Sequence, residues 1–156
     1  MAMLGATIHS VDSSGRITLK EEHGRRLPEM VFLAQGWDGC VLLMLEQQLD
    51  DVKAVLRQYG ILDPDVDDMR RMLLGTCCES KIDGQRRLKL PEALRDWAGI
   101  VPGESRALVM DLGTRYEIWE EERYRSYMAS RAPELRNVAR QLFGSVEPEE
   151  AEDEAE

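Results

Sequence analysis

Short apolar stretches alternate along this chain with turns rich in glycine and aspartate. The pattern predicts two sets of four strands, at residues 6–11, 16–20, 30–35 and 40–45 and at residues 76–82, 87–90, 105–110 and 115–119. Turns are expected between them at residues 12–15, 36–39, 83–86 and 111–115. Because each set contains hairpins and is followed by a helical pattern, the sequence predicts an α+β protein.

Apolar residues recur at helical spacing after each set of strands, which predicts helices over residues 46–59 and 120–130. Residues 91–98 are expected to form a short helix, because Pro91 suits a first helical position and Gly99 suits a left-handed cap. Further helices are expected from Pro64 to about Leu74 and after Pro133.

The two sets of strands are copies of one pattern. Gly5-Ala-Thr, a short strand, Asp12, three turn residues and Arg16 correspond to Gly75-Thr, a short strand, Asp83, three turn residues and Arg87, 71 positions later. A single β-β-α-β-β-α unit with four short strands would have open edges and a thin core. We therefore expect two tandem units that interleave their hairpins and pack together in one chain.

The chain is accordingly divided into a first unit with its helix (residues 4–59), a connecting helix (60–74), a second unit with its helix (75–130), a C-terminal helix (131–146) and an acidic tail (147–156). The tail holds seven acids and no base, so it is expected to be disordered. Without it the chain has 20 bases and 23 acids, and the net charge changes from −10 to −3. The acidic total therefore leaves room for a basic surface on the folded part.

The loop between the first two strands of each unit has the composition of a binding turn. The Asp12 carboxylate can accept hydrogen bonds from backbone N–H groups further along the turn, and Gly15 is free to take a positive φ. Arg16 then leaves the turn with a planar fork that can pair with phosphate or with O6 and N7 of guanine. Double-stranded DNA is the expected partner, because a two-stranded ribbon fits its major groove.

The second turn offers the same arrangement with one further cation. Asp83 and Gly84 would shape it, and Arg86 and Arg87 would face the DNA. Additional cations flank the two turns at Lys20, Lys81 and Lys89. A purely structural interpretation stays open, in which each aspartate pairs with its arginine only to hold the turn. Because the motif occurs twice at equivalent places, we favour DNA binding.

The order of these motifs resembles the MraZ family. The resemblance rests on Gly-Ala-Thr, Asp-x-x-Gly-Arg16, Leu73-Leu74-Gly75, Asp83-Gly-x-x-Arg87-Leu and Leu90-Pro-x-x-Leu-Arg-x-x-Ala-Gly99, and it covers residues 4 to about 130. It implies two AbrB-like swapped-hairpin units in a bacterial transcription regulator of a division and cell-wall gene cluster. It also implies a ring-shaped homo-oligomer on the nucleoid that binds direct repeats in promoter DNA through Arg16 and Arg87.

Four positions depart from the family pattern. Ser14 stands where the family usually has lysine, Lys20 where it has proline and Arg86 where it has glycine, and an arginine common in the family falls near Gly24. A side chain at a turn position that needs positive φ carries a steric penalty. The second turn is therefore where we expect this chain to differ from its relatives.

Two other function classes fit parts of the sequence. An AbrB-fold assembly or antidote partner would work mainly through residues 132–156. An enzyme would need acids such as those at 63–68 or 120–122, but these stand at helix starts, where acids interact with the helix dipole. His9 and His23 lack neighbours at ligand spacing, and no catalytic triad or phosphate loop is present. We therefore expect no catalysis, cofactor, metal or small-molecule substrate.

The longest fully apolar run, residues 40–45, is far shorter than the roughly 20 residues of a membrane helix. No signal-peptide pattern is present, so a cytoplasmic protein is expected. The cysteines Cys40, Cys77 and Cys78 are expected to be buried apolar residues, because neither their number nor their spacing suits disulfides or zinc. Among the aromatic residues, Trp37, Tyr116 and Trp119 are expected in the core or a subunit interface, and Trp97 on its own sheet.

Overall fold

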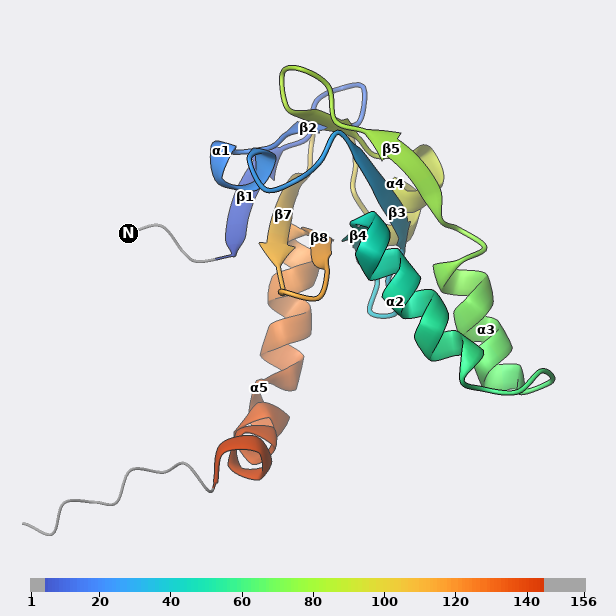
Figure 1. Cartoon of the computed structure of the whole chain (residues 1–156). Coiled ribbons are helices and arrows are strands. Elements are labelled where there is room, and N and C mark those ends of the chain that lie inside the picture. Colours follow the sequence, from blue (N-terminus) through green and yellow to red (C-terminus); the bar gives the residue numbers. More distant parts are fainter. Residues whose placement is uncertain (1–4, 145–156) are drawn as a thin grey trace, which may run out of the picture. The chain divides into compact units, whose positions relative to one another are not determined.

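The computed structural model describes residues 5–144, and this part of the chain forms two compact units that divide between Tyr124 and Arg125. The elements along the chain are β1 (Ala6–Ser10), β2 (Arg16–Thr18), α1 (Glu21–Gly24), β3 (Met30–Gln35), β4 (Val41–Met44), α2 (Glu46–Arg57), α3 (Pro64–Leu73), β5 (Cys78–Lys81), β6 (Arg87–Lys89), α4 (Glu92–Ala98), β7 (Arg106–Asp111), β8 (Tyr116–Glu120) and α5 (Glu121–Phe143) (Figure 1). The α+β class is confirmed. The expected acidic tail, residues 147–156, lies outside the described residues.

The strands form two antiparallel sheets in which the two halves of the chain are interleaved. The larger sheet has the order β1-β7-β8-β4-β3-β5, and β2 and β6 form a separate two-stranded ribbon. The hairpins β3–β4 and β7–β8 are formed within their own half. In contrast, β1 pairs with β7, β5 pairs with β3, and β2 pairs with β6. The expected interleaving of hairpins is therefore present.

The pairing of strands follows an approximate two-fold relation between the halves. Its centre is the contact between β4 and β8, where Leu42 stands opposite Glu117. On either side of this pair, Val41 faces Ile118 and Leu43 faces Tyr116. Moving outward, each half contributes its own hairpin and then receives the first strand of the other half as the edge. Each half therefore completes the sheet of the other.

One hydrophobic core lies between the ribbon and the larger sheet and draws on both halves of the chain. Its members include residues of the ribbon, of the larger sheet and of α4, among them Ile17, Leu88, Leu33, Val109 and Leu94. Ile17, Leu33, Leu88 and Val109 have no exposed surface, and Leu94 is 3% exposed. Removing this apolar surface from water is the main stabilising contribution to such a fold. The two halves are thus held together by a shared core.

The helix boundaries follow from local chemistry. Pro64 opens α3 at a position where a missing N–H costs nothing, and Asp63 caps the helix by accepting hydrogen bonds from the N–H groups of Asp65 and Val66. Gly99 closes α4 with a left-handed φ of 69°. These two predictions from sequence are confirmed, although Pro91 precedes α4 as its cap and does not form its first residue.

Two sequence-based predictions about packing and helices are wrong. Trp97 does not pack on its own sheet: its indole N–H donates to the carbonyls of Gly36 and Cys40, both at 3.1 Å, in the β3–β4 turn of the first half. The helices expected at 120–130 and 131–146 are a single helix, α5, that runs through Pro133. Pro133 is exposed, so its missing N–H leaves no buried carbonyl unsatisfied, and Arg131 and Glu134 form an ion pair across the same turn.

The cysteines are free thiols. Cys40 is buried, and burial raises the pKa of its thiol to about 12, so the thiol stays protonated. Cys77 and Cys78 are half-buried, and burial raises the pKa of both. No helix within residues 5–144 is long and apolar enough to cross a membrane.

Candidate nucleic-acid interface

The first Asp-x-x-x-Arg turn connects β1 to β2 and is closed by its own aspartate. Oδ1 of Asp12 accepts hydrogen bonds from the backbone N–H groups of Ser14 at 2.8 Å and of Arg16 at 2.9 Å. Gly15 takes a φ of 79°, which glycine adopts without strain. The N–H of Arg16 is the main cause that holds the pKa of Asp12 below its ordinary value, so this carboxylate stays charged.

The second turn, between β5 and β6, repeats this geometry. Oδ1 of Asp83 accepts hydrogen bonds from the N–H groups of Gln85 and Arg87, both at 2.9 Å, and the latter is the main cause of a lowered pKa for Asp83. In this turn the residue with positive φ is Arg86, at 61°, whereas the equivalent residue of the first turn is Gly15. The second turn therefore carries backbone strain that the first does not. Gly84 has no positive φ, and a Cβ there would meet no atom within 4 Å. The turn therefore does not depend on glycine at position 84.

Each motif arginine pairs with its aspartate through one edge of the guanidinium. Nε of Arg16 lies 3.2 Å from Oδ2 of Asp12, and Nε of Arg87 lies 2.7 Å from Oδ2 of Asp83. The two arginine side chains are 36% and 34% exposed. Within residues 5–144, their Nη1 and Nη2 atoms make no hydrogen bond. The structural pairing thus occurs, and it orients each arginine while leaving its outer edge available to another acceptor.

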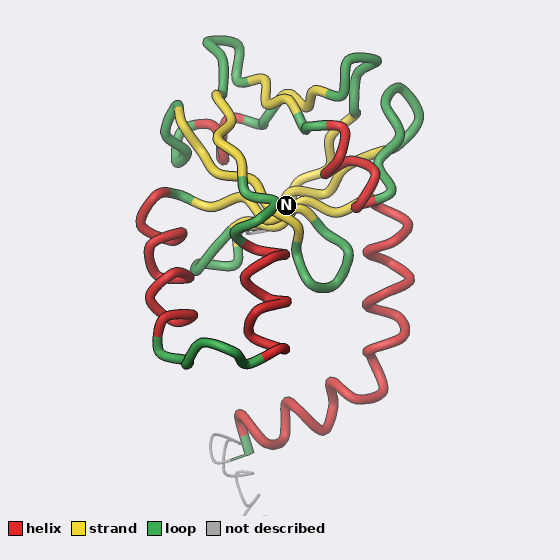
Figure 2. Tube along the Cα trace, turned by 90° about the vertical axis from the view of Figure 1, so that its right-hand side faces the viewer, coloured by secondary structure: helices red, strands yellow, loops and turns green. Residues whose placement is uncertain are grey.

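The two turns project from opposite ends of the β2–β6 ribbon, at the top of Figures 1 and 2. The ribbon pairs Arg16 with Lys89, Ile17 with Leu88 and Thr18 with Arg87. Ile17 and Leu88 are completely buried, so the other four side chains lie on the opposite face of the ribbon. Three of these four are cations. The outer face of the ribbon is therefore basic and its inner face belongs to the core.

The other lysines predicted to contact DNA differ in their surroundings. Lys20 is exposed and directly follows β2. Lys81, at the end of β5, forms an ion pair with Glu29 at 2.8 Å, and this carboxylate raises the pKa of Lys81. Residues 12–20 and 83–91 together contain five bases and two acids. The two turns and their strands are therefore basic, although the whole chain has a net charge of −10.

Helix α4 adds an arginine that sequence reasoning missed. A Cβ at Gly15 would lie 2.1 Å from Nη1 of Arg95, so this guanidinium lies against the first turn although it comes from the other half of the chain. Arg95 is half-buried, and its Nε makes no hydrogen bond to any described residue. The repeat spacing aligns Arg95 with Gly24. The sequence alone, however, does not show that α4 of the second half packs against the first turn, because this contact depends on the exchange of strands between the halves.

The two histidines have structural surroundings. Nδ1 of His9 lies 2.8 Å from the carbonyl oxygen of Thr18, to which it donates, and Nε2 lies 2.6 Å from the hydroxyl of Thr7, from which it accepts. His23 is buried edge-on against Tyr116, with ring centroids 5.7 Å apart. Burial is the main cause that lowers the pKa of both histidines. They support β1, the ribbon and the core.

The acids at the start of α5 serve the helix. The Glu120 carboxylate accepts hydrogen bonds from the N–H groups of Glu122 at 3.2 Å and Arg123 at 2.7 Å, and Glu121 pairs with Arg106 through two hydrogen bonds of 2.6 and 2.8 Å. In the part of the chain that the structure describes, no group of three or more His, Cys, Asp or Glu side chains could hold a metal ion. This arrangement matches capping of a helix start.

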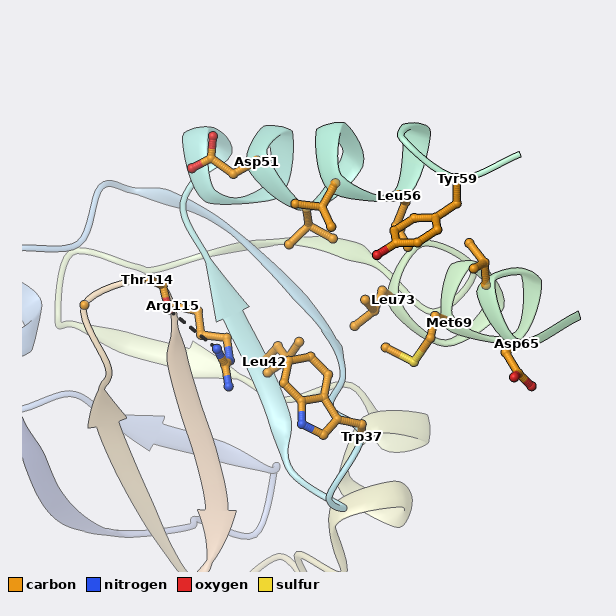
Figure 3. A pocket seen from close by; sticks show the side chains of 14 residues that line it. Trp37, Leu42, Asp51, Leu56, Tyr59, Asp65, Met69, Leu73, Thr114 and Arg115 are labelled. Carbon is orange, nitrogen blue, oxygen red and sulfur yellow. Dashed lines mark hydrogen bonds between the residues drawn. The ribbon is translucent and has the colours of Figure 1, made fainter. Parts of the chain in front are cut away.

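An apolar groove of about 710 Å³ lies elsewhere in the first unit, between α2, α3 and the β7–β8 turn (Figure 3). Its lining includes Leu42, Leu56 and Met69, and the guanidinium of Arg115 lies 4.7 Å above the ring of Trp37. Asp51 and Asp65, the acids in its lining, stand at opposite sides of the groove in Figure 3. These two carboxylates are therefore not placed as an acid/base pair.

Proteins named transcriptional regulator MraZ are similar to this chain over most of its length. The protein of Acetivibrio thermocellus is 27% identical over 134 residues, which cover 86% of this chain and 92% of the relative. That of Caldicellulosiruptor saccharolyticus is 26% identical over 140 residues, covering 90% and 96%, and that of Syntrophomonas wolfei is 28% identical over 139 residues, covering 89% and 95%. No family model matches the chain. The resemblance carried by the motifs is confirmed by these relatives: over most of its length the chain is similar to proteins named transcriptional regulator MraZ.

Proposed function

We propose that this chain is a sequence-specific DNA-binding regulator that contacts promoter DNA with the β2–β6 ribbon and its two turns. The observation that carries the proposal is the outer face of the ribbon, where Arg16, Arg87 and Lys89 stand over a buried apolar face. Lysine and arginine supply most of the affinity for DNA by neutralising phosphates, and a two-stranded ribbon fits a major groove about 12 Å wide. The relatives, named as transcriptional regulators, support this assignment.

The geometry of the turns suits arginine-based recognition. Arg16 and Arg87 stand on neighbouring strands, two positions apart along the ribbon, so their Cα atoms are about 8 Å apart. Both side chains therefore fit within one major groove. The aspartates hold Nε and leave Nη1 and Nη2 for phosphate oxygens or for O6 and N7 of guanine. The arginines are thus oriented before the DNA arrives, which lowers the entropic cost of binding.

We further infer that the active form is a ring-shaped homo-oligomer that binds direct repeats in the promoter. With a net charge of −10, a single subunit has only a small basic face to set against repulsion from DNA. Several linked subunits would combine weak contacts into tight binding. By the family resemblance, the target is the promoter of a division and cell-wall gene cluster, which would place the protein on the nucleoid.

The arginines can be tested on DNA from upstream of the protein's own gene. Arg16→Ala and Arg87→Ala should each abolish the gel shift, while size-exclusion chromatography shows an unchanged oligomer. Arg57→Ala is the matched control, because it removes one cation from α2, away from the ribbon. Wild-type binding by both motif variants would contradict the proposed DNA-binding site.

The ring and the repeats can be tested by footprinting on the same DNA. Periodic protection over short direct repeats is expected, since each subunit of the ring would contact one repeat. A single protected site of the size that one subunit covers would contradict the ring model. Affinity should also fall steeply with salt, because every phosphate contact releases condensed counterions.

A further inference from the structure

The two turns have a glycine and an arginine at exchanged positions. In the first site the turn residue is Gly15, and the residue that faces it is Arg95 of α4; a Cβ at Gly15 would lie 2.1 Å from Nη1 of Arg95. In the second site the turn residue is Arg86, and it faces Gly24 of α1; a Cβ at Gly24 would lie 2.6 Å from Cδ of Arg86. Each site therefore has space for one arginine at this contact.

The exchange is between equivalent positions. Gly15 and Arg86 are separated by the same 71 positions as the aspartates of the two turns, and so are Gly24 and Arg95. The backbone confirms the match, since Leu90 donates to the carbonyl of Gly15 at 3.0 Å in one site and Leu19 donates to the carbonyl of Arg86 at 2.8 Å in the other. The first site thus receives its arginine from the facing helix, and the second carries it on the turn itself.

Both arginines stand beside a turn without a charge partner. Among residues 5–144, neither Arg86 nor Arg95 forms an ion pair, in contrast to Arg25, which pairs with Glu21 on α1. Arg86 is exposed and has a positive φ, a strained position that glycine would relieve. Arg95 is half-buried, with an Nε that finds no acceptor in the described structure. An anionic ligand at the turns would provide the missing partner for both.

We propose that Arg95 and Arg86 are the second cations of the first and the second turn, and that each contacts a DNA phosphate. This inference rests on the proposed DNA-binding function. Each turn then offers the same chemistry, an aspartate-oriented arginine and a second guanidinium, despite different sequences. The strain at Arg86 is retained because Gly24, on the facing helix, supplies no cation.

Removing either second cation should weaken DNA binding by one phosphate contact per subunit. Arg95→Ala and Arg86→Ala should each lower the affinity for the upstream DNA and reduce the slope of log K against log salt by about one or more. Arg25→Ala, which removes an exposed and already paired cation directly after α1, is the control and should leave the slope unchanged. An unchanged slope in both Arg95→Ala and Arg86→Ala would overturn the proposal.

The exchange itself can be reversed in the second site. Arg86→Gly alone should weaken binding, and Gly24→Arg alone should destabilise the fold, because its Cβ would overlap the Arg86 stem. The double variant should restore both stability and binding, since it rebuilds the arrangement of the first site. A stable double variant that binds no better than Arg86→Gly would overturn the proposal.

The same titrations separate this proposal from the proposed function. If Arg16→Ala and Arg87→Ala abolish binding while Arg86→Ala and Arg95→Ala keep the wild-type slope, the second cations are wrong and DNA binding stands. If all four variants bind like the wild type, the two turns are not the DNA-binding site, and the proposed function fails at this site. Thermal unfolding of each variant shows that the comparison is made between folded proteins.

Discussion

Truncating the apolar residues at the centre of the ribbon would show whether the two halves of the chain share one core. Ile17 in β2 and Leu88 in β6 stand opposite each other, and both side chains are fully buried. Replacing either by alanine removes three carbon atoms from a closed site, which costs about 2–5 kcal/mol. For a unit of this size, a loss of about 3 kcal/mol lowers the melting temperature by roughly 10 °C.

Both variants should shift the same cooperative transition, although the two residues lie in different halves. Urea unfolding at one protein concentration, followed by far-ultraviolet circular dichroism and by tryptophan fluorescence, should give coincident curves with an unchanged dependence on urea. The double variant should cost less than the sum of the single variants by about 0.5–3 kcal/mol, because the two truncations open one cavity.

Thr18→Ala is the control on the same strand. Thr18 lies on the outer face of the ribbon and is exposed, so the change should alter stability by about 0.5 kcal/mol or less. The reasoning would be refuted if Leu88→Ala produced two separate transitions, with one half of the chain still folded. A loss of less than about 1 kcal/mol in both core variants would refute it as well.

Two further predictions concern packing between the halves. Burial lowers the pKa of His23 in the folded state, so the unfolded chain takes up its proton first and stability should fall as the pH drops below about 6.5. His23→Leu places in the first half the residue found at the equivalent position 94, and it should make stability less dependent on pH between about 7.5 and 5.5. An unchanged pH dependence in urea titrations would contradict this. Trp97→Phe removes the indole N–H that donates to the carbonyls of Gly36 and Cys40. It should lower the free energy of unfolding by only about 1 kcal/mol, because both carbonyls keep a backbone donor. A decrease of more than about 3 kcal/mol in thermal unfolding would contradict this and assign the indole a larger packing role.

The turns were predictable because their chemistry is local. In the described part of the chain, the carboxylates of Asp12 and Asp83 accept hydrogen bonds only from residues two and four positions later, and their carbonyls accept one from the residue three positions later, so the sequence contains what shapes each loop. The same holds for the strain at Arg86, since a departure from glycine at a position of positive φ is visible in the sequence. Strand positions and most helix positions also followed from the spacing of apolar residues.

The partners of the strands were less predictable, because alternation shows which face of a strand is buried but does not identify its neighbour. Interleaving was expected from the thin core of a single unit, whereas the pairing of β1 with β7 and β3 with β5 required the structure. For this reason the sequence did not indicate Arg95, and the predicted packing of Trp97 was wrong. Both lie on α4, whose contacts reach the turns of the other half.

At Pro133, by contrast, a local signal in the sequence led to a wrong prediction. A proline normally ends or bends a helix, so the sequence favoured two helices at this point. At an exposed site, however, the missing N–H removes one hydrogen bond without burying an unsatisfied group, and the pairing of Arg131 with Glu134 supports the following turn. The tendency of proline to end a helix is thus outweighed here by the helical turns on either side of it.

The exchange of strands also affects how the chain folds while it is being synthesised. β1 pairs with β7, whose residues emerge from the ribosome about 100 positions later, a delay of roughly 5–20 s at ordinary rates of translation. During this time the first half has an open sheet edge and an uncovered apolar ribbon strand. A neighbouring nascent chain on the same message offers the same missing strand, so exchange between chains competes with exchange within one chain. We therefore expect the yield of correctly folded subunits to depend on how widely ribosomes are spaced along the message.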